Sequence, residues 1–179
     1  AVVAAVEAAG VRSQMFSLNH SPWAQAAKQA VESGAVGEVI GLHCDLMFAK
    51  GYPWEAPLGK PRKQDPYPKR FTFTDSKREL RATGVYAVAL IHWLTGAAVQ
   101  TVFCTTENYF FEEHMRNDVE DFGTLALTLD GGIVATIACG RIGWNSHQSS
   151  GPNKLRIVGT KGAVTIDAHK PRIEVCADE

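Results

Sequence analysis

The second half of the chain is a succession of short strand-like runs, and this pattern limits the fold more than any other feature. FGTLALTL and IVATIACG flank the turn DGG, which predicts a β-hairpin. VQTVFCTTENYF precedes the hairpin as a further strand, and KLRIVG, AVTID and RIEVC follow it, the first two joined by the turn GTKG. About six or seven strands accompany two substantial helices, which predicts an α/β fold of the α+β type: a large, mostly antiparallel open sheet with helices on one face.

Two segments have the pattern of helices. SPWAQAAKQAVESGAVG begins with Ser21 as N-cap and Pro22 at the first helical position, and Gly34 lies beyond its end. Its apolar face is formed by Trp23, Ala26, Ala27, Ala30 and Val31. The second segment, KRELRATGVYAVALIHWLTG over residues 77–96, begins with charges, continues as an apolar helix and is closed by Gly96.

Between these helices, EVIGLHCDLMF alternates as a strand does. The core face would carry Ile40, Leu42, Cys44, Leu46 and Phe48, and the other face Gly41, His43 and Asp45. His43 and Asp45 do not make a metal site without a third ligand, so we expect no metal. Residues 50–70 have no periodicity and hold five of the eight prolines, so they are either a functional lid or a disordered linker.

The first twenty residues read as a helix over 1–9, stopped by Gly10, and a strand over VRSQMFSLN. Such a strand needs a sheet to join, and the chain lacks an initial Met, so we expect it to be a piece of a longer protein. The Ala-rich opening has no basic stretch and contains Glu7, which excludes a signal peptide.

Composition excludes several classes of partner. Eighteen Lys and Arg oppose 19 Asp and Glu, so the formal charge of -1 favours neither nucleic acid nor an anionic membrane. No apolar run approaches the roughly 18 residues of a membrane span. Four separated cysteines without a C-x-x-C pair predict reduced core residues of a cytoplasmic protein: Cys44, Cys104, Cys139 and Cys176.

The order of these segments resembles the C-terminal part of the Gfo/Idh/MocA oxidoreductases, the family of glucose-fructose oxidoreductase and inositol dehydrogenase. The resemblance rests on AAG before a strand ending in NHSP, on AKQAVESGAVGEVIGL and on ELRATGVYAVALIHWLTG. It continues through VEDFGTLALTLDGGIVATI and LRIVGTKGAVTID, so it spans nearly the whole chain.

The resemblance implies two parts. Residues 1–20 would be the last helix and strand of a dinucleotide-binding Rossmann domain, and residues 21–179 a domain for substrate binding and oligomerisation. The phosphate-binding glycine loop, the family's E-K-P lysine and the main site for NAD or NADP would lie upstream of Ala1. The isolated chain would then bind no nicotinamide cofactor and would be inactive.

The family motif, roughly G-G-G-x-x-x-D-x-G-x-H/Y before a helix ending in W-L-x-G, places Tyr86 at the His/Tyr position. Gly84 matches, but Ala82 replaces the aspartate, and three charged residues replace the glycines. Ala82 and Tyr86 share a helix face at i and i+4, and a neighbouring ammonium would make the phenol a candidate base for a hydroxyl proton. The alternative is that Tyr86 is an ordinary packed aromatic residue.

Further candidates for substrate binding come from loops and element ends. Asn19 and His20 fall where the family often has an N-x-R pair, although His20 also fits a solvated loop histidine. Arg81 could hold a hydroxyl or carboxylate, or lie on the surface. Asn145 and His147 lie in the polar-aromatic segment RIGWNSHQSSG, which fits a sugar-covering loop or a plain surface loop. His92, among apolar helix neighbours, is predicted to be a core histidine.

Together these features predict the substrate-binding half of an NAD(P)-dependent oxidoreductase that acts on a sugar, cyclic polyol or related hydroxy compound. We expect a homodimer or higher homo-oligomer formed through the uncovered face of the sheet. The rival reading is a non-catalytic domain of the same fold, which binds a ligand or partner and has lost the carboxylate at Ala82.

Overall fold

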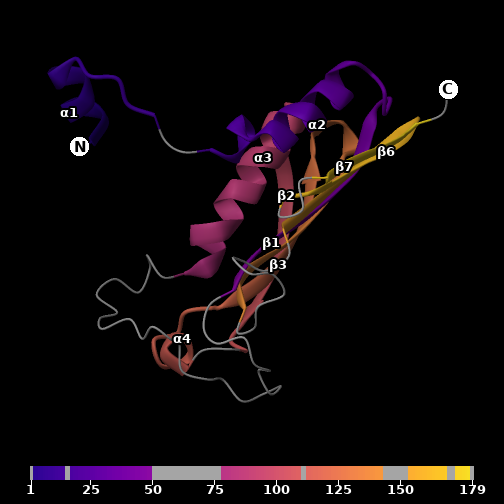
Figure 1. Ribbon diagram of the computed structural model, residues 1–179. Coiled ribbons are helices and arrows are strands. Elements are labelled where there is room, and N and C mark those ends of the chain that lie inside the picture. Colours follow the sequence, from indigo (N-terminus) through magenta and orange to yellow (C-terminus); the bar gives the residue numbers. More distant parts are fainter. Residues whose placement is uncertain are drawn as a thin grey trace.

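The described residues of the computed structural model are 2–14, 17–49, 78–109, 112–142, 153–168 and 172–177 (Figure 1). The segment 50–70 and the candidates Asn145 and His147 lie outside these ranges.

The described residues form a seven-stranded open sheet with the order β2-β3-β4-β1-β5-β6-β7. Its strands are β1 Val39–Ala49, β2 Val99–Glu107, β3 Phe122–Leu129, β4 Val134–Ile142, β5 Asn153–Gly159, β6 Gly162–Asp167 and β7 Arg172–Ala177. Five neighbouring pairs are antiparallel and β1 with β4 is parallel, so the expected mostly antiparallel sheet is confirmed. The hairpin of β3 and β4 turns through the short helix η4, Asp130–Gly132.

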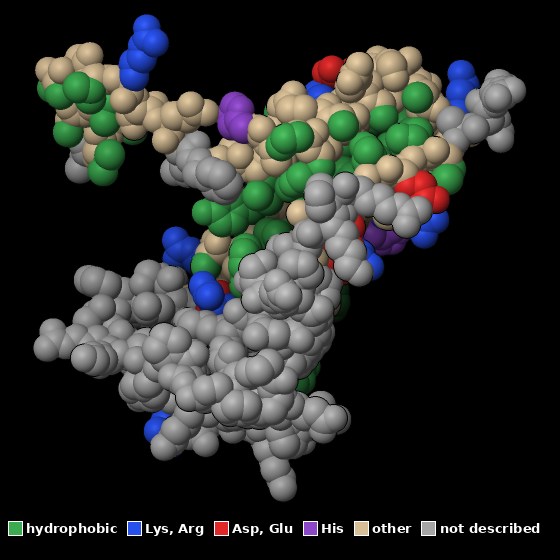
Figure 2. All heavy atoms as spheres, in the orientation of Figure 1, with side chains coloured by type: hydrophobic (Ala, Val, Ile, Leu, Met, Phe, Trp, Pro, Cys, Tyr) green, Lys and Arg blue, Asp and Glu red, His purple; other side chains and the backbone are tan. Residues whose placement is uncertain are grey.

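Helices lie on one face of this sheet (Figure 1). They are η1 Leu18–His20, α2 Pro22–Glu32, the π-helical turn η3 Leu80–Gly84 and α3 Val85–Thr95. Helix α1, Val2–Ala9, lies apart, and α4, Glu112–Arg116, lies at the opposite end of the molecule. The core fills the layer between α2, α3 and the strands, where Leu42, Leu90, Ile91, Leu94, Ile137 and Ile157 are almost fully buried. Figure 2 shows hydrophobic side chains gathered over α2 and α3.

Helix α2 begins and ends where its sequence signals indicate. Ser21 occupies the N-cap and Pro22 the first turn, but the Ser21 hydroxyl donates to the carbonyl oxygen of Leu18 at 2.6 Å instead of capping the helix. Ala24 and Ala27 are the fully buried residues of the helix, and both are small enough to let it approach the sheet closely.

Helix α3 ends at the expected residue but its histidine was misjudged. Gly96 is left-handed (φ 69°), and its N–H donates to the carbonyl oxygen of His92 at 2.7 Å. The prediction of a core histidine is wrong: His92 is exposed, and its ring Nδ1 lies 2.9 Å from the carbonyl oxygen of Ala97. The His92 imidazole in the last turn thus contacts the backbone that follows the helix.

Strand β1 follows the predicted alternation except at its start. Leu42, Cys44 and Leu46 are buried against the helices. Ile40, which we expected on the same face, is 48% exposed, because the pairing of β1 with β5 shifts register between Val39 and Gly41. A bulge of this kind turns one side chain away from the face that strict alternation assigns to it.

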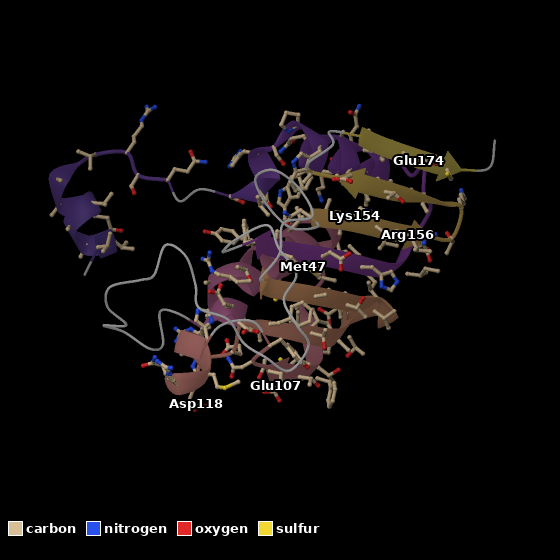
Figure 3. The ribbon with its side chains drawn as sticks, turned by 60° about the horizontal axis from the view of Figure 1, so that its bottom comes forward. Met47, Glu107, Asp118, Lys154, Arg156 and Glu174 are labelled. Atoms are coloured by element: carbon tan, nitrogen blue, oxygen red, sulfur yellow. The ribbon has the colours of Figure 1, made fainter. Side chains whose placement is uncertain are left out.

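The face of the sheet away from the helices is broad and open. Figure 3 shows Met47, Lys154, Arg156 and Glu174 on this face. Strand pairing aligns His43 with Arg156 and Asp45 with Lys154, so the Asp45 carboxylate neighbours the Lys154 ammonium on its β1–β5 half. The half formed by β2, β3 and β4 is mostly Thr, Ala and Val with Phe103, which is 72% exposed.

Residues 11–19 contradict the predicted strand: the described ones, 11–14 and 17–19, form no strand. A strand forms only against a partner edge, and no strand of the described sheet pairs with this segment. Helix α1 itself is present as predicted, but it buries none of its residues, and Val2 and Val3 are 76% and 70% exposed.

The four cysteines differ in burial, although all were predicted to be core residues. Cys44 and Cys139 are buried in the core, whereas Cys104 and Cys176 are exposed on strands near the sheet edges. Burial raises the pKa of the Cys44 thiol to about 12, with a smaller contribution from the nearby charge of Asp45. The alternation of strand residues could not distinguish a central strand from an edge strand, where both faces meet solvent.

Candidate active site

Tyr86 lies in the first turn of α3, directly after the π-helical turn. Its ring is half-buried and packs against the hydrophobic core. Ala82 is half-buried as well, whereas Arg81 and Val85 are exposed, so Ala82 and Tyr86 occupy one ridge of the helix and Arg81 the next. Ala82 and Tyr86 are thus alike in burial, and their sharing of one pocket stays a prediction.

The π-helical turn itself was not predicted from the sequence. It lies close to the sheet because a glycine on each side leaves room for a larger neighbour: a Cβ on Gly84 would meet Cys139 Sγ at 3.1 Å, and one on Gly123 would meet Leu80 Cδ1 at 2.6 Å. Burial raises the pKa of the Cys139 thiol to about 11, and a hydrogen bond with Thr83 partly opposes this rise. Turns of this type are rare and often occur at functional sites.

Two carboxylates bind the residues at the start of this turn. Glu79 is 3% exposed; its Oε1 lies 2.5 Å from Arg141 Nε and 4.0 Å from His114 Nε2. Glu120 is 8% exposed; its Oε2 accepts a hydrogen bond from Arg78 Nη1 at 2.9 Å.

Glu120 also caps the helix, because its Oε1 accepts the backbone N–H of Leu80 at 3.2 Å. We call Glu79 and Glu120, with these partners, the carboxylate clamp. Sequence analysis missed it, since its members lie 40 to 62 residues apart in the chain. The only sequence signal was the presence of charged residues where the family motif has glycines.

Asn19 and His20 lie in η1, which contacts α3, so they are on the same side of the sheet as Tyr86. The Asn19 side-chain oxygen is buried and has no hydrogen-bond partner among the described residues. His20 is exposed, and its Nε2 lies 2.9 Å from Gln14 Nε2. A buried acceptor without a donor is unfavourable, so Asn19 is the described candidate best suited to accept a hydrogen bond from a ligand.

An apolar cavity of about 230 Å³ lies between η1, α2, α3 and strands β1, β5 and β6. Leu18, Trp23, Phe48, Ala87 and Leu90 line it, and Asn153 contributes a polar group. Leu18 and Ala87 line the cavity, but their chain neighbours Asn19 and Tyr86 are not among its lining residues. A cavity of this kind can hold the apolar face of a ring whose hydroxyl groups meet polar residues at its rim.

Other candidates do not join this site. Arg81 lies in η3 with its side chain exposed, and it makes no hydrogen bond or ion pair with the described residues. His43 and Asp45 lie on the opposite face of the sheet, where His43 Nδ1 is 2.7 Å from Thr136 Oγ1. Within the described ranges, no three His, Cys, Asp or Glu side chains come together as metal ligands.

The described residues do not form a cradle for a dinucleotide. Such a cradle needs a glycine-rich turn from a parallel strand into a helix whose first N–H groups point at the phosphates. Helix α2 follows the short helix η1 and has Pro22, which lacks an N–H, in its first turn. Among the described residues, none of the helices has both the length and the hydropathy to cross a membrane.

Comparison with known proteins agrees with this architecture. The model of the GFO/IDH/MocA C-terminal domain matches residues 24–165. The chain belongs to the Gfo/Idh/MocA family of oxidoreductases.

Solved structures share the fold at low identity. The WlbA dehydrogenase from Bordetella pertussis, in complex with NADH and UDP-GlcNAcA, is 21% identical with a TM-score of 0.67, covering 98% of this chain and 49% of that one. The scyllo-inositol dehydrogenase from Lactobacillus casei, with NAD(H) and scyllo-inositol, is 16% identical with a TM-score of 0.64, covering 90% and 43%.

The myo-inositol 2-dehydrogenase from Lactobacillus plantarum is 21% identical with a TM-score of 0.63, covering 83% of this chain and 39% of that one. The chain thus spans less than half the length of each of these solved structures. No curated protein matches the sequence.

Proposed function

We propose that this chain is the substrate-binding half of an NAD(P)-dependent oxidoreductase acting on a sugar, cyclic polyol or related hydroxy compound. The observation that carries the proposal is the position of Tyr86: it stands at the His/Tyr position of the family motif, half-buried in the first turn of α3 and one residue before Ala87, which lines the apolar cavity. Relatives of the same fold bind a sugar nucleotide or an inositol.

In this proposal the chain binds and orients the substrate and moves one proton. The cavity holds the apolar face of the ring, Asn19 accepts a hydroxyl hydrogen bond, and the Tyr86 hydroxyl handles the proton of the reacting hydroxyl group. A bound nicotinamide supplies the hydride chemistry. A phenol titrates near about 10, so a cationic neighbour is needed to make Tyr86 an effective base.

We propose that the cofactor, NAD or NADP, is bound mainly by residues outside this chain, and that residues 1–20 belong to that nucleotide-binding part. Helix α1 supports the division, because it lies apart from the sheet with its valines exposed (Figure 2). A helix of eight residues is marginal in water unless it packs against something. Residues 21–179 then form the substrate and assembly domain.

We also propose that the open face of the sheet joins copies of the chain. Exposed Phe103 on β2 and exposed Val134 on β4 lie at the apolar half of this face. The β1–β5 half places the Asp45 carboxylate beside the Lys154 ammonium, so it offers groups of both signs to another copy of the same surface.

Ala82 favours a second candidate function, a non-catalytic domain that binds a ligand or partner. Ala82 stands where the motif has an aspartate, so the chain lacks a carboxylate there that could accept a proton from the substrate. Under this alternative Tyr86 is only a packed aromatic residue.

The test is Tyr86→Phe in the complete enzyme that the proposal implies. This change keeps the ring and its packing but removes the hydroxyl, so turnover should fall by about 10²- to 10⁴-fold while folding is unchanged. Tyr109→Phe is the matched control, because Tyr109 lies away from α3 against Phe122. Turnover at the wild-type level in Tyr86→Phe, with an intact circular dichroism spectrum, would falsify the catalytic role and favour the second candidate.

A further inference from the structure

The carboxylate clamp joins three separate parts of the chain at the start of the π-helical turn. Arg78 and Glu79 precede the turn, Glu120 precedes β3, and Arg141 lies near the end of β4. Glu79 and Glu120 are almost fully buried, so removing one partner would leave the other poorly solvated. Ion pairs in such positions hold a fixed geometry, whereas exposed pairs contribute little.

The clamp acts on the first residues of the turn. Glu120 accepts the Leu80 N–H, and the Thr83 hydroxyl donates to the Glu79 carbonyl oxygen at 2.7 Å. A π-helical turn is a local insertion into an α-helix, and relaxing it to α-helical geometry would rotate one flank of the helix relative to the other. The clamp opposes that rotation at the upstream flank.

The downstream flank is fixed by packing. Ala87, Leu90, Ile91 and Leu94 are buried against the sheet, so the body of α3 cannot turn without losing its core contacts. Tyr86 lies in the first turn of α3, two residues after the π-helical turn ends at Gly84 and one residue before the first of these buried side chains. A change in the geometry of the turn would therefore reach the first turn of α3, which carries Tyr86, before it reaches the packed body of the helix.

We propose that Glu79 and Glu120 are positioning residues for Tyr86. Their ion pairs hold the π-helical turn against the sheet, and the turn in its place holds the first turn of α3, which carries the phenol. This inference rests on the proposed function for its catalytic consequence, but its structural consequence can be measured separately. Neither carboxylate touches the substrate in this proposal.

The kinetic experiment is a double-mutant cycle in the complete enzyme with Glu79→Gln and Tyr86→Phe. Glu79→Gln should lower kcat by about 10- to 100-fold, with KM changing less than threefold, since small displacements of a catalytic group reduce rates on this scale. In the Tyr86→Phe background the same change should have almost no effect on kcat. Glu32→Gln, which removes an exposed pair with Lys28 on α2, is the control and should leave kcat unchanged.

The structural experiment uses the 179-residue chain and the nuclear magnetic resonance signals of the Tyr86 ring. Glu79→Gln and Glu120→Gln should each shift these signals, while Glu32→Gln should not. If either variant fails to fold, Arg141→Lys and Arg78→Lys keep the charge while losing the guanidinium geometry, and they should shift the same signals.

The outcomes separate the two proposals. A normal rate in Tyr86→Phe refutes the proposed function, and the ring signals then decide the positioning role alone. A strong effect of Tyr86→Phe with an equal effect of Glu79→Gln in both backgrounds would overturn the positioning role and leave the proposed function standing. Unchanged ring signals in the folded Glu79→Gln and Glu120→Gln variants would also overturn it.

Discussion

The close approach of the π-helical turn to β3 gives a sharp prediction for Gly123→Ala. The added Cβ would lie 2.6 Å from Leu80 Cδ1, 3.0 Å from Thr106 Cγ2 and 3.1 Å from the carbonyl oxygen of Thr105. Carbon atoms pack best at roughly 3.5–4.0 Å, so all three neighbours must move. The Leu80 side chain can rotate, but the Thr105 carbonyl belongs to β2, where Thr105 pairs with Thr124 of β3.

Overpacking of this kind destabilises a protein by about 1–3 kcal/mol. For a domain of this size, roughly 2–4 °C of melting temperature corresponds to each kcal/mol. We therefore expect the melting temperature to fall by about 2–12 °C in Gly123→Ala, measured by circular dichroism or calorimetry.

Gly41→Ala is the matched control on another strand of the same sheet. Its Cβ would meet Val134 at 3.7 Å, which is ordinary contact, so this change should be neutral or stabilising by up to about 1 kcal/mol. Leu80→Ala should lower stability less in the Gly123→Ala background than in the wild type, because the smaller side chain relieves the overlap. Equal melting temperatures for wild type and Gly123→Ala would refute the argument, as would an equal fall in Gly41→Ala.

Three further predictions concern the chain as a whole. A thiol reagent at pH 8 should modify Cys104 and Cys176 and reach Cys44 and Cys139 only on unfolding, so four rapidly reacting thiols would contradict their burial. Burial raises the pKa of the Cys44 and Cys139 thiols, so above the ordinary thiol pKa of 9.0 they keep protons that the unfolded chain loses. The free energy of unfolding should therefore fall as the pH rises from about 9 to 11. Sedimentation should show concentration-dependent self-association that Phe103→Asp weakens, whereas a monomer at high concentration would exclude the open face as an interface. Calorimetric titration of the isolated chain with NADH and NADPH should show no appreciable binding, and micromolar affinity for either would refute the division of the cofactor site.

Much of the fold follows from local sequence signals. The hairpin of β3 and β4, the turn between β5 and β6 and the end of α3 at Gly96 are set by residues close together in the chain. The segment 11–19 was misread as a strand because its β-type composition says nothing about an available partner edge. Ile40 and Cys104 were misplaced because a bulge and an edge position are properties of the assembled sheet.

The candidate site was likewise predictable only where its residues are close together in the chain. The i, i+4 spacing places Ala82 and Tyr86 on one ridge of the helix, which the burial of both residues agrees with. The carboxylate clamp could not be predicted, since Glu79 meets Arg141 only after β4 has joined the sheet, and no local pattern encodes a contact across 62 residues. The π-helical turn shares this origin, because it depends on close packing at Gly84 and Gly123.

The parallel pairing of β1 with β4 has a consequence for how the chain is made. Residues of β1 leave the ribosome long before their neighbours: His43 waits for Thr136, 93 residues later, and Met47 for Asn153, 106 residues later. At roughly 5–20 residues per second, the centre of the sheet stays unpaired for about 5–20 s of synthesis. Until α3 has also been synthesised, the apolar side chains of Leu42, Cys44 and Leu46 have only α2 to cover them, so nascent chains of this protein should be clients for chaperones that bind short apolar segments.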